Sequence, residues 1–303
     1  MKITSKNKLL FSIVIIGLLL FLMLYFLFSP FLPSNPTTSD LKKTGISVIK
    51  SLYSSIIYHA DLNQLNNFQT RTNSKNGMMQ VFVPKGDFLM GAEDGKASKN
   101  HPMHKVTLNS FWIDQVEVTN KMYEKCVSDN SCQAPMLLDP YYSKIWFESY
   151  PVVYINWQQA SNYCKWAEGD LPTEAEWEKA ARGIEGGQYP WGNEIPDARS
   201  ANFNNNIGML ISAYTYQEGF SPYGALNMAG NAREWVKDWF NDTYYSRTPD
   251  NNPMGAPIGH YKSLRGGSYL DDGVEISSYN RFFHQPGSAG INRGFRCVTR
   301  DAG

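Results

Sequence analysis

The sequence predicts a mixed fold of short strands and short helices joined by long loops, placed behind a transmembrane helix. Alternating apolar segments at 79–91 and 106–119 are typical of strands. Segments with N-cap residues and helical periodicity follow them along the chain. The stretch 183–260 is dominated by Gly, Pro, Asn and Tyr, which favour loops and turns.

Residues 9–28 carry the clearest physical signal. They are apolar except for one serine and one glycine, three lysines precede them, and no charge follows before Asp40. A helix of about 20 residues is long enough to cross a bilayer core of about 30 Å. The positive-inside rule then leaves residues 1–8 in the cytoplasm and the main domain outside it, in the periplasm or at the cell surface. We therefore expect an uncleaved signal anchor in a single-pass membrane protein.

A cleaved signal peptide is the competing interpretation of this segment. Its apolar region would be about 7–15 residues long and would end in a small-residue cleavage site. The sequence "SPFLPSNP" that follows the apolar run offers no such site.

Residues 29–77 are expected to form a linker and a stalk. The first ten are rich in proline and serine, which is typical of an extended spacer. Ser39 can cap a helix that begins near Asp40, with apolar residues at helical spacing up to Ile57. This helix could also lie on the membrane surface, although its polar face carries few lysines.

The main domain is expected to extend over residues 78–303, with three short helices. Thr119 can cap the first, over 120–127. Capping boxes begin the other two, Asn156 with Gln159 and Thr173 with Glu176. Gly183 is a suitable residue to end the last helix.

Charge argues against nucleic acid as a partner. The 28 basic and 28 acidic residues balance to a net charge of zero. No concentrated basic run is present, so the chain lacks the electrostatic footprint of a nucleic-acid-binding protein.

A set of motifs in the main domain stands in a recognisable order. They are "GDFLMG", "HKVTLNSFWIDQVEVTNKMY", "PVVYINWQQASNYCKWA", "LPTEAEWEKAARG", "YPWGNE", "ANFN", "SPYGALNMAGNAREWVKDW", "LRGGSY" and "NRGFRCV". Together they resemble the formylglycine-generating enzyme (sulfatase-modifying factor) family over residues 78–300. The resemblance implies an α+β fold of the C-type-lectin-like kind, low in regular structure and rich in loops.

The resemblance also implies a chemistry that this sequence departs from. Active family members use oxygen and copper to oxidise a sulfatase cysteine to formylglycine, and two cysteine thiolates hold the copper. The matching positions here are Asp271 and Ile276. A carboxylate is a hard ligand that does not replace a thiolate for Cu(I). We therefore expect no copper cofactor and assign no catalytic residue.

Four cysteines are present, at 126, 132, 164 and 297, and they allow three pairings. Export would place them in an oxidising compartment. The resemblance pairs Cys164 with Cys297. Cys126 and Cys132 are close enough in sequence to close a small loop, so all four are expected to be structural.

The stretch "NMAGNAREW" resembles a calcium-binding segment of the family. The matching ligand positions are Asn227, Gly230, Ala232 and Glu234, and such oxygen donors suit Ca²⁺. The alternative is a turn in which the Asn227 and Glu234 side chains bond only to backbone. A second family calcium site would begin at Asn202, but its acidic ligand has no clear match here.

The expected binding surface is the family cleft, around Arg233, Arg265, Ser268, Asp271 and Arg281. A non-oxidase member would use it to bind a peptide, a glycan or a small molecule. An enzyme that holds a metal through oxygen and nitrogen ligands, and an active oxidase, are the alternatives. Ser268 has no His–Asp relay that the sequence identifies.

The histidines divide into two groups. His104 matches a framework position of the family, and Pro102 argues against a helical His101–His104 metal pair. His284 follows "NRFF" and is a candidate to line the cleft beside Ser268.

Overall fold

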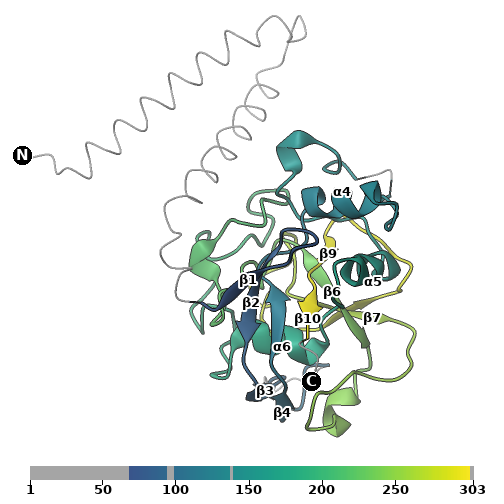
Figure 1. Ribbon diagram of the computed structural model, residues 1–303. Coiled ribbons are helices and arrows are strands. Elements are labelled where there is room, and N and C mark those ends of the chain that lie inside the picture. Colours follow the sequence, from purple (N-terminus) through teal and green to yellow (C-terminus); the bar gives the residue numbers. More distant parts are fainter. Residues whose placement is uncertain (1–67, 94–98, 137–138, 301–303) are drawn as a thin grey trace, which may run out of the picture. The chain divides into compact units, whose positions relative to one another are not determined.

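The computed structural model describes residues 68–93, 99–136 and 139–300 (Figure 1). The expected span 9–28 and the expected stalk helix lie outside these residues. Within the described part, no helix is long and apolar enough to cross a membrane. The strands are β1 Thr70–Thr72, β2 Met79–Val83, β3 Gly86–Met90, β4 His104–Leu108, β5 Phe111–Asp114, β6 Arg233–Trp239, β7 Lys262–Arg265, β8 Phe282–His284, β9 Arg293–Phe295 and β10 Val298–Thr299.

One antiparallel sheet joins the two ends of the described chain. Its strand order is β1-β2-β5-β10, and Ile113 of β5 pairs with both Val81 of β2 and Val298 of β10. Strand β1 precedes residue 78, where the sequence places the start of the domain. The domain therefore includes at least the residues from Thr70 onward, because β1 completes this sheet by pairing with β2.

A second sheet has the order β8-β7-β6-β9, and β3 pairs with β4 separately. Strand β6 is antiparallel to β7 and parallel to β9. It lies inside the stretch 183–260 that composition predicts as loop, so that prediction is wrong over residues 233–239. Composition could not reveal β6, because its alternation is broken by buried polar residues such as Glu234 and Asp238.

In the part of the chain that the structure describes, three α-helices lie between the strands, and their predicted caps are confirmed. The Thr119 side chain caps α4, Asn120–Ser128. Capping boxes at Asn156–Gln159 and Thr173–Glu176 begin α5, Trp157–Trp166, and α6, Glu174–Arg182, and Gly183 ends the latter with a φ of 67°. Three short 3₁₀ helices are η2 Ile145–Phe147, η3 Gln217–Gly219 and η4 Tyr244–Arg247.

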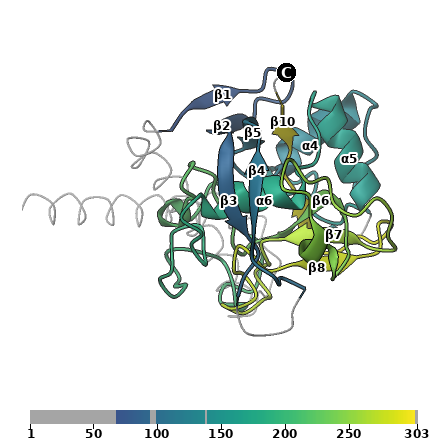
Figure 2. The same ribbon diagram turned by 90° about the horizontal axis from the view of Figure 1, so that it is seen from below.

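Helix α6 occupies the centre of the domain. All nine of its residues are buried, and it contacts β3, β4, β6 and β7 (Figure 2). Five of the nine are charged, so burial requires that each find a partner. Their partners, described below, include two of the arginines that the sequence places in the cleft.

Two disulfides cross-link the fold, as predicted. Cys164 of α5 is joined to Cys297, next to β10, across a separation of 133 residues. Cys126 is joined to Cys132 at the end of α4. All four cysteines of the sequence are used, and none is free. The result is the predicted α+β fold, with short elements held together by side-chain contacts and covalent links.

Candidate functional site

The segment that follows β7 brings the two positions expected for thiolates close to a tight turn. Gly266 and Gly267 have φ values of 87° and 69°, a region that glycine adopts without strain. A Cβ atom on Gly267 would lie 3.0 Å from the Cα of Ile276 and 2.8 Å from its side chain. Only glycine at 267 therefore lets the chain return this closely, which places Ile276 beside the turn.

Asp271 is held by two neighbours, Ser268 and Arg233. Its carboxylate accepts hydrogen bonds from the backbone amide and the hydroxyl of Ser268, both at 2.7 Å. The Arg233 guanidinium donates to it twice, from Nε at 2.9 Å and from Nη2. Asn292 in turn donates to the Ser268 hydroxyl at 3.1 Å. The carboxylate is thus fixed in place and its charge is already paired.

Ile276 is fully buried. It packs in an apolar cluster with Tyr189, Ala201 and Ala229. Both expected thiolate positions are therefore occupied by side chains with other partners, one in an ion pair and one in the core.

Ser268 and Asp271 are themselves buried beneath the partly exposed Arg233, whereas Arg265 and Arg281 are turned away from this group and pair with α6 in the interior. The Arg265 guanidinium pairs with Glu178 of α6, and both side chains have 0% exposure. Arg281 pairs with Glu174 at the start of α6 at 2.8 Å. Burial opposes the ionisation of Glu174, but Arg281 and Arg265 outweigh it and lower its pKa.

The calcium-like segment contains one open ligand position. Asn227 has a φ of 53°, and its side-chain amide donates to Glu117 at 3.1 Å and to the Ala213 carbonyl at 2.8 Å. Its buried Oδ1 atom has no hydrogen-bond partner. Gly230 lies against Asn202, whose Oδ1 is also buried and unpartnered. Unpartnered amide oxygens of this kind are suitable donors for Ca²⁺.

Glu234, the expected carboxylate ligand, already has strong partners. Arg296 donates to both of its oxygens at 2.7 Å, and Trp177 Nε1 donates to Oε2 at 2.7 Å. A carboxylate has about four lone-pair positions, so about one remains on Oε1. Burial, together with the Glu234 charge, raises the pKa of nearby Glu117 to about 8. The described residues contain no group of three or more acidic, His or Cys side chains that could hold a metal ion.

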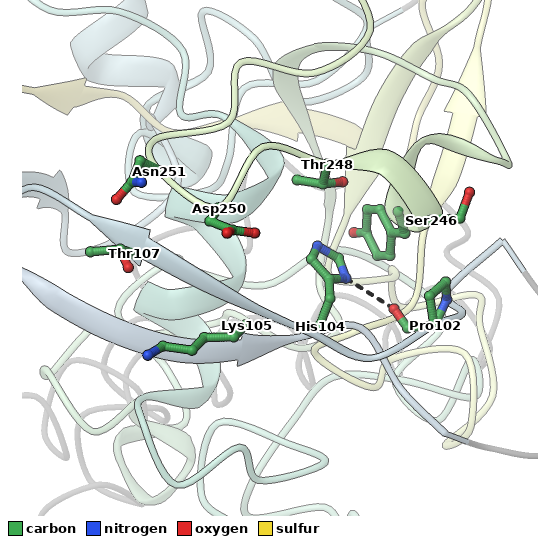
Figure 3. Close-up of a pocket in the computed structure, with 9 residues that line it drawn as sticks. Pro102, His104, Lys105, Thr107, Ser246, Thr248, Asp250 and Asn251 are labelled. Carbon is green, nitrogen blue, oxygen red and sulfur yellow. Dashed lines mark hydrogen bonds between the residues drawn. The ribbon is translucent and has the colours of Figure 1, made fainter.

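A cavity of about 490 Å³ lies elsewhere, along β4, η4 and the segment that follows η4 (Figure 3). His104 lines it, with Nδ1 at 2.9 Å from the Pro102 carbonyl and its ring edge-on to Tyr245. No residue of the predicted cleft lines this cavity. The contact with Tyr245 agrees with a framework role for His104.

Comparisons with known proteins identify the family of this chain. Residues 65–301 match the family described as "Sulfatase-modifying factor enzyme 1-like domain". The chain belongs to this family. A formylglycine-generating enzyme of Streptomyces coelicolor is 31% identical over 278 residues, covering 73% of this chain and 88% of the relative.

Two further similar proteins extend the comparison. A protein of Chlamydia caviae named serine/threonine-protein kinase pkn1 is 33% identical over 72% of this chain, which spans only 37% of that relative. The solved structure of PvdO from Pseudomonas aeruginosa superposes with a TM-score of 0.65 at 24% identity, covering 76% of this chain and 97% of the other. At that identity the structure supports the shared fold alone.

Sequence reasoning does not identify two polar residues, one beside Ser268 and one beside Asn227. Asn292 is 24 residues beyond Ser268, which it contacts, and Glu117 is 110 residues before Asn227, which it contacts. Neither residue carries a local sequence signal, because each contact joins residues that only folding brings together.

Proposed function

We propose that this chain is a membrane-anchored, extracytoplasmic family member that binds a ligand through the surface around Arg233, Ser268 and Asp271 and does not oxidise cysteine. The observation that carries the proposal is the pairing of Asp271 with Arg233 and Ser268. Cu(I) prefers soft thiolate ligands, whereas a carboxylate is a hard ligand, and here an arginine already neutralises its charge. The four cysteines give no substitute, because all are in disulfides.

The test uses the full-length chain purified in detergent. Its affinity for Cu(I) is measured by competition with a chromogenic chelator, and a cysteine-containing sulfatase peptide is followed by mass spectrometry under oxygen. We expect no high-affinity Cu(I) binding and no formylglycine product. Tight Cu(I) binding together with peptide oxidation would overturn the proposal and establish the alternative, an active oxidase, which the identity to the Streptomyces enzyme favours.

A divergent metal-dependent enzyme is the other alternative. Ser268 and Asp271 would have to hold an oxygen-liganded cation in such an enzyme. The Arg233 guanidinium already neutralises Asp271, which leaves that arrangement without support.

Calcium is the proposed structural ion. We infer that Asn227 Oδ1 and the carbonyls of Gly230 and Ala232 hold it, with Glu234 adding its remaining lone pair. Removing calcium with a chelator should lower the unfolding temperature by roughly 5–10 °C, the effect of a ligand present at about 100 times its Kd. Calcium should restore the value and magnesium should not. If neither the chelator nor calcium changes the unfolding temperature, the proposal of a structural calcium ion is wrong.

The membrane anchor is proposed from residues 9–28. Alkaline carbonate extraction of membranes should leave the full-length chain in the pellet, and a variant that begins at residue 29 should be released. A phosphatase reporter fused at the C-terminus, active only outside the cytoplasm, tests the orientation. An inactive reporter on a membrane-bound chain would show that the C-terminus lies in the cytoplasm and would overturn the proposed orientation.

A further inference from the structure

Two arginines are partners on neighbouring strands, and one of them pairs with Asp271. Arg233 of β6 and Arg293 of β9 are partners in the parallel register. Neighbouring strands are about 4.8 Å apart, and partners in register leave the sheet on the same face. Like charges in this position are unfavourable unless something neutralises them. Asp271 pairs with Arg233, whereas Arg293 has no carboxylate partner among residues 68–93, 99–136 and 139–300.

Two more basic side chains meet this face. Phe282 of β8 has the Arg233 guanidinium 3.8 Å from its ring centroid and the Lys99 ammonium 4.9 Å from it. His284 follows two residues later on the same strand and therefore points to the same face as Phe282. We call Lys99, Arg233, His284 and Arg293 the basic face.

Every unused polar atom of the basic face is a hydrogen-bond donor. Arg233 uses Nε and Nη2 on Asp271, which leaves Nη1. Arg293 uses Nη1 on the Ser288 hydroxyl and Nη2 on the Ala289 carbonyl, which leaves Nε. Guanidinium and ammonium groups have no acceptor atoms. A partner for this face must therefore supply acceptors.

The histidine and the lysine follow the same pattern. His284 Nδ1 accepts from the Gln285 amide at 3.0 Å, so its proton is on Nε2. The Lys99 ammonium makes no hydrogen bond to a described side chain. Burial, and next to it the charge of Arg233, lowers the pKa of Lys99, which an added anion would reverse. The charge of Glu275, an exposed carboxylate, acts against this effect.

We propose that the basic face binds an oxyanion group (a carboxylate, sulfate or phosphate) of the ligand, between Arg293 Nε, Arg233 Nη1 and Lys99. Guanidinium forks match the oxygens of such groups, and charge-assisted hydrogen bonds are among the stronger contacts available. Asp271 orients Arg233 for this role. The inference rests on the proposed function, because it assigns a ligand class to the same surface.

The test titrates the full-length chain in detergent with sulfate, phosphate or glutarate by calorimetry, at fixed ionic strength set with sodium chloride. We expect saturable binding of at least one of these anions. Arg293→Gln and Lys99→Gln should each weaken it about tenfold, the loss of one charge-assisted contact. Arg247→Gln, an exposed arginine on η4, is the matched control and should leave the affinity unchanged.

The outcomes show which kind of oxyanion the ligand carries. They also distinguish failure of this inference from failure of the proposed function. Sulfate or phosphate binding alone assigns a tetrahedral group to the ligand, and glutarate binding alone assigns a carboxylate. An absence of saturable binding, or an equal loss in Arg247→Gln, overturns the inference. Thermal unfolding verifies that each variant is folded. If Arg293→Gln does not fold, the anion affinity of Lys99→Gln decides the inference. Copper and peptide oxidation assays decide the proposed function independently of this titration.

Discussion

At residue 271 a single carboxylate connects two parts of the chain that are 38 residues apart. Its partners are a guanidinium on β6 and the hydroxyl and amide of Ser268 in the turn after β7. The sequence could identify position 271 from the family motif. It could not identify the pairing with Arg233, because nothing local in "GNAREW" points to residue 271.

Replacing Asp271 with asparagine tests this pairing. The amide keeps one acceptor oxygen but loses the charge that neutralises Arg233, so we expect a loss of about 1–3 kcal/mol in the free energy of unfolding. Urea denaturation measures it. Asp272→Asn is the matched control, because Asp272 is exposed and its Oδ1 contacts to the following turn survive in asparagine. Equal effects of the two variants would contradict a special role for Asp271.

Arg265 provides the contrasting case. Arg265→Met leaves the buried Glu178 carboxylate with one arginine partner, Arg182, in place of two, and removing one partner of a buried pair typically costs about 3–5 kcal/mol. We expect a large fall in stability, with ligand affinity unchanged in the folded fraction. Denaturation and anion titration of the same variant measure both. A loss of anion affinity with unchanged stability would instead show that Arg265 belongs to the binding cleft.

At the scale of elements, α6 gathers buried charge from several strands. Asp238 of β6 accepts a hydrogen bond from the Glu174 amide at the beginning of α6, at 2.9 Å. Burial, reinforced by the Glu174 charge, raises the pKa of Asp238 from 3.8 to about 8. The helix caps could be predicted from sequence because capping is local, but these ion pairs could not, since each joins residues far apart in the chain.

The raised pKa of Asp238 predicts a pH dependence. The folded state keeps a proton on Asp238 that the unfolded state releases near pH 3.8, so the stabilisation is complete below that pH and is lost as pH rises towards about 8. Urea unfolding across this range should therefore show stability falling with pH. Asp238→Asn should flatten that part of the profile. A variant with the same slope as the unchanged chain would assign the effect to other groups.

At the scale of the whole molecule, the long disulfide joins α5 to the segment before β10. Chain-entropy arguments give about 5 kcal/mol for a loop of this size and about 2 kcal/mol for the loop between Cys126 and Cys132. We therefore expect the double variant Cys164→Ala/Cys297→Ala to lose more stability than Cys126→Ala/Cys132→Ala. Thermal unfolding of the two variants at equal concentration compares them. A larger loss for the short loop would contradict the entropic account.

Predictability also depends on scale. The fold class, the helix caps and both disulfides could be predicted, because ordered motifs and local chemistry determine them. Strand β6 and the position of β1 inside the domain could not be predicted, because both depend on pairing with other strands. Of the five cleft residues expected, Arg233, Ser268 and Asp271 come together, while α6 holds Arg265 and Arg281 inside.

The pairing of Arg233 with Asp271 also limits which substitutions evolution can accept at these two positions. A neutral residue at 271 would leave a half-buried guanidinium beside Arg293 without its counter-charge, and a neutral residue at 233 would leave a buried carboxylate unpaired. Neither single step is tolerated well, so the two positions should change together among related chains. A cysteine at 271 could keep the counter-charge only as a thiolate, a form that a neighbouring guanidinium favours.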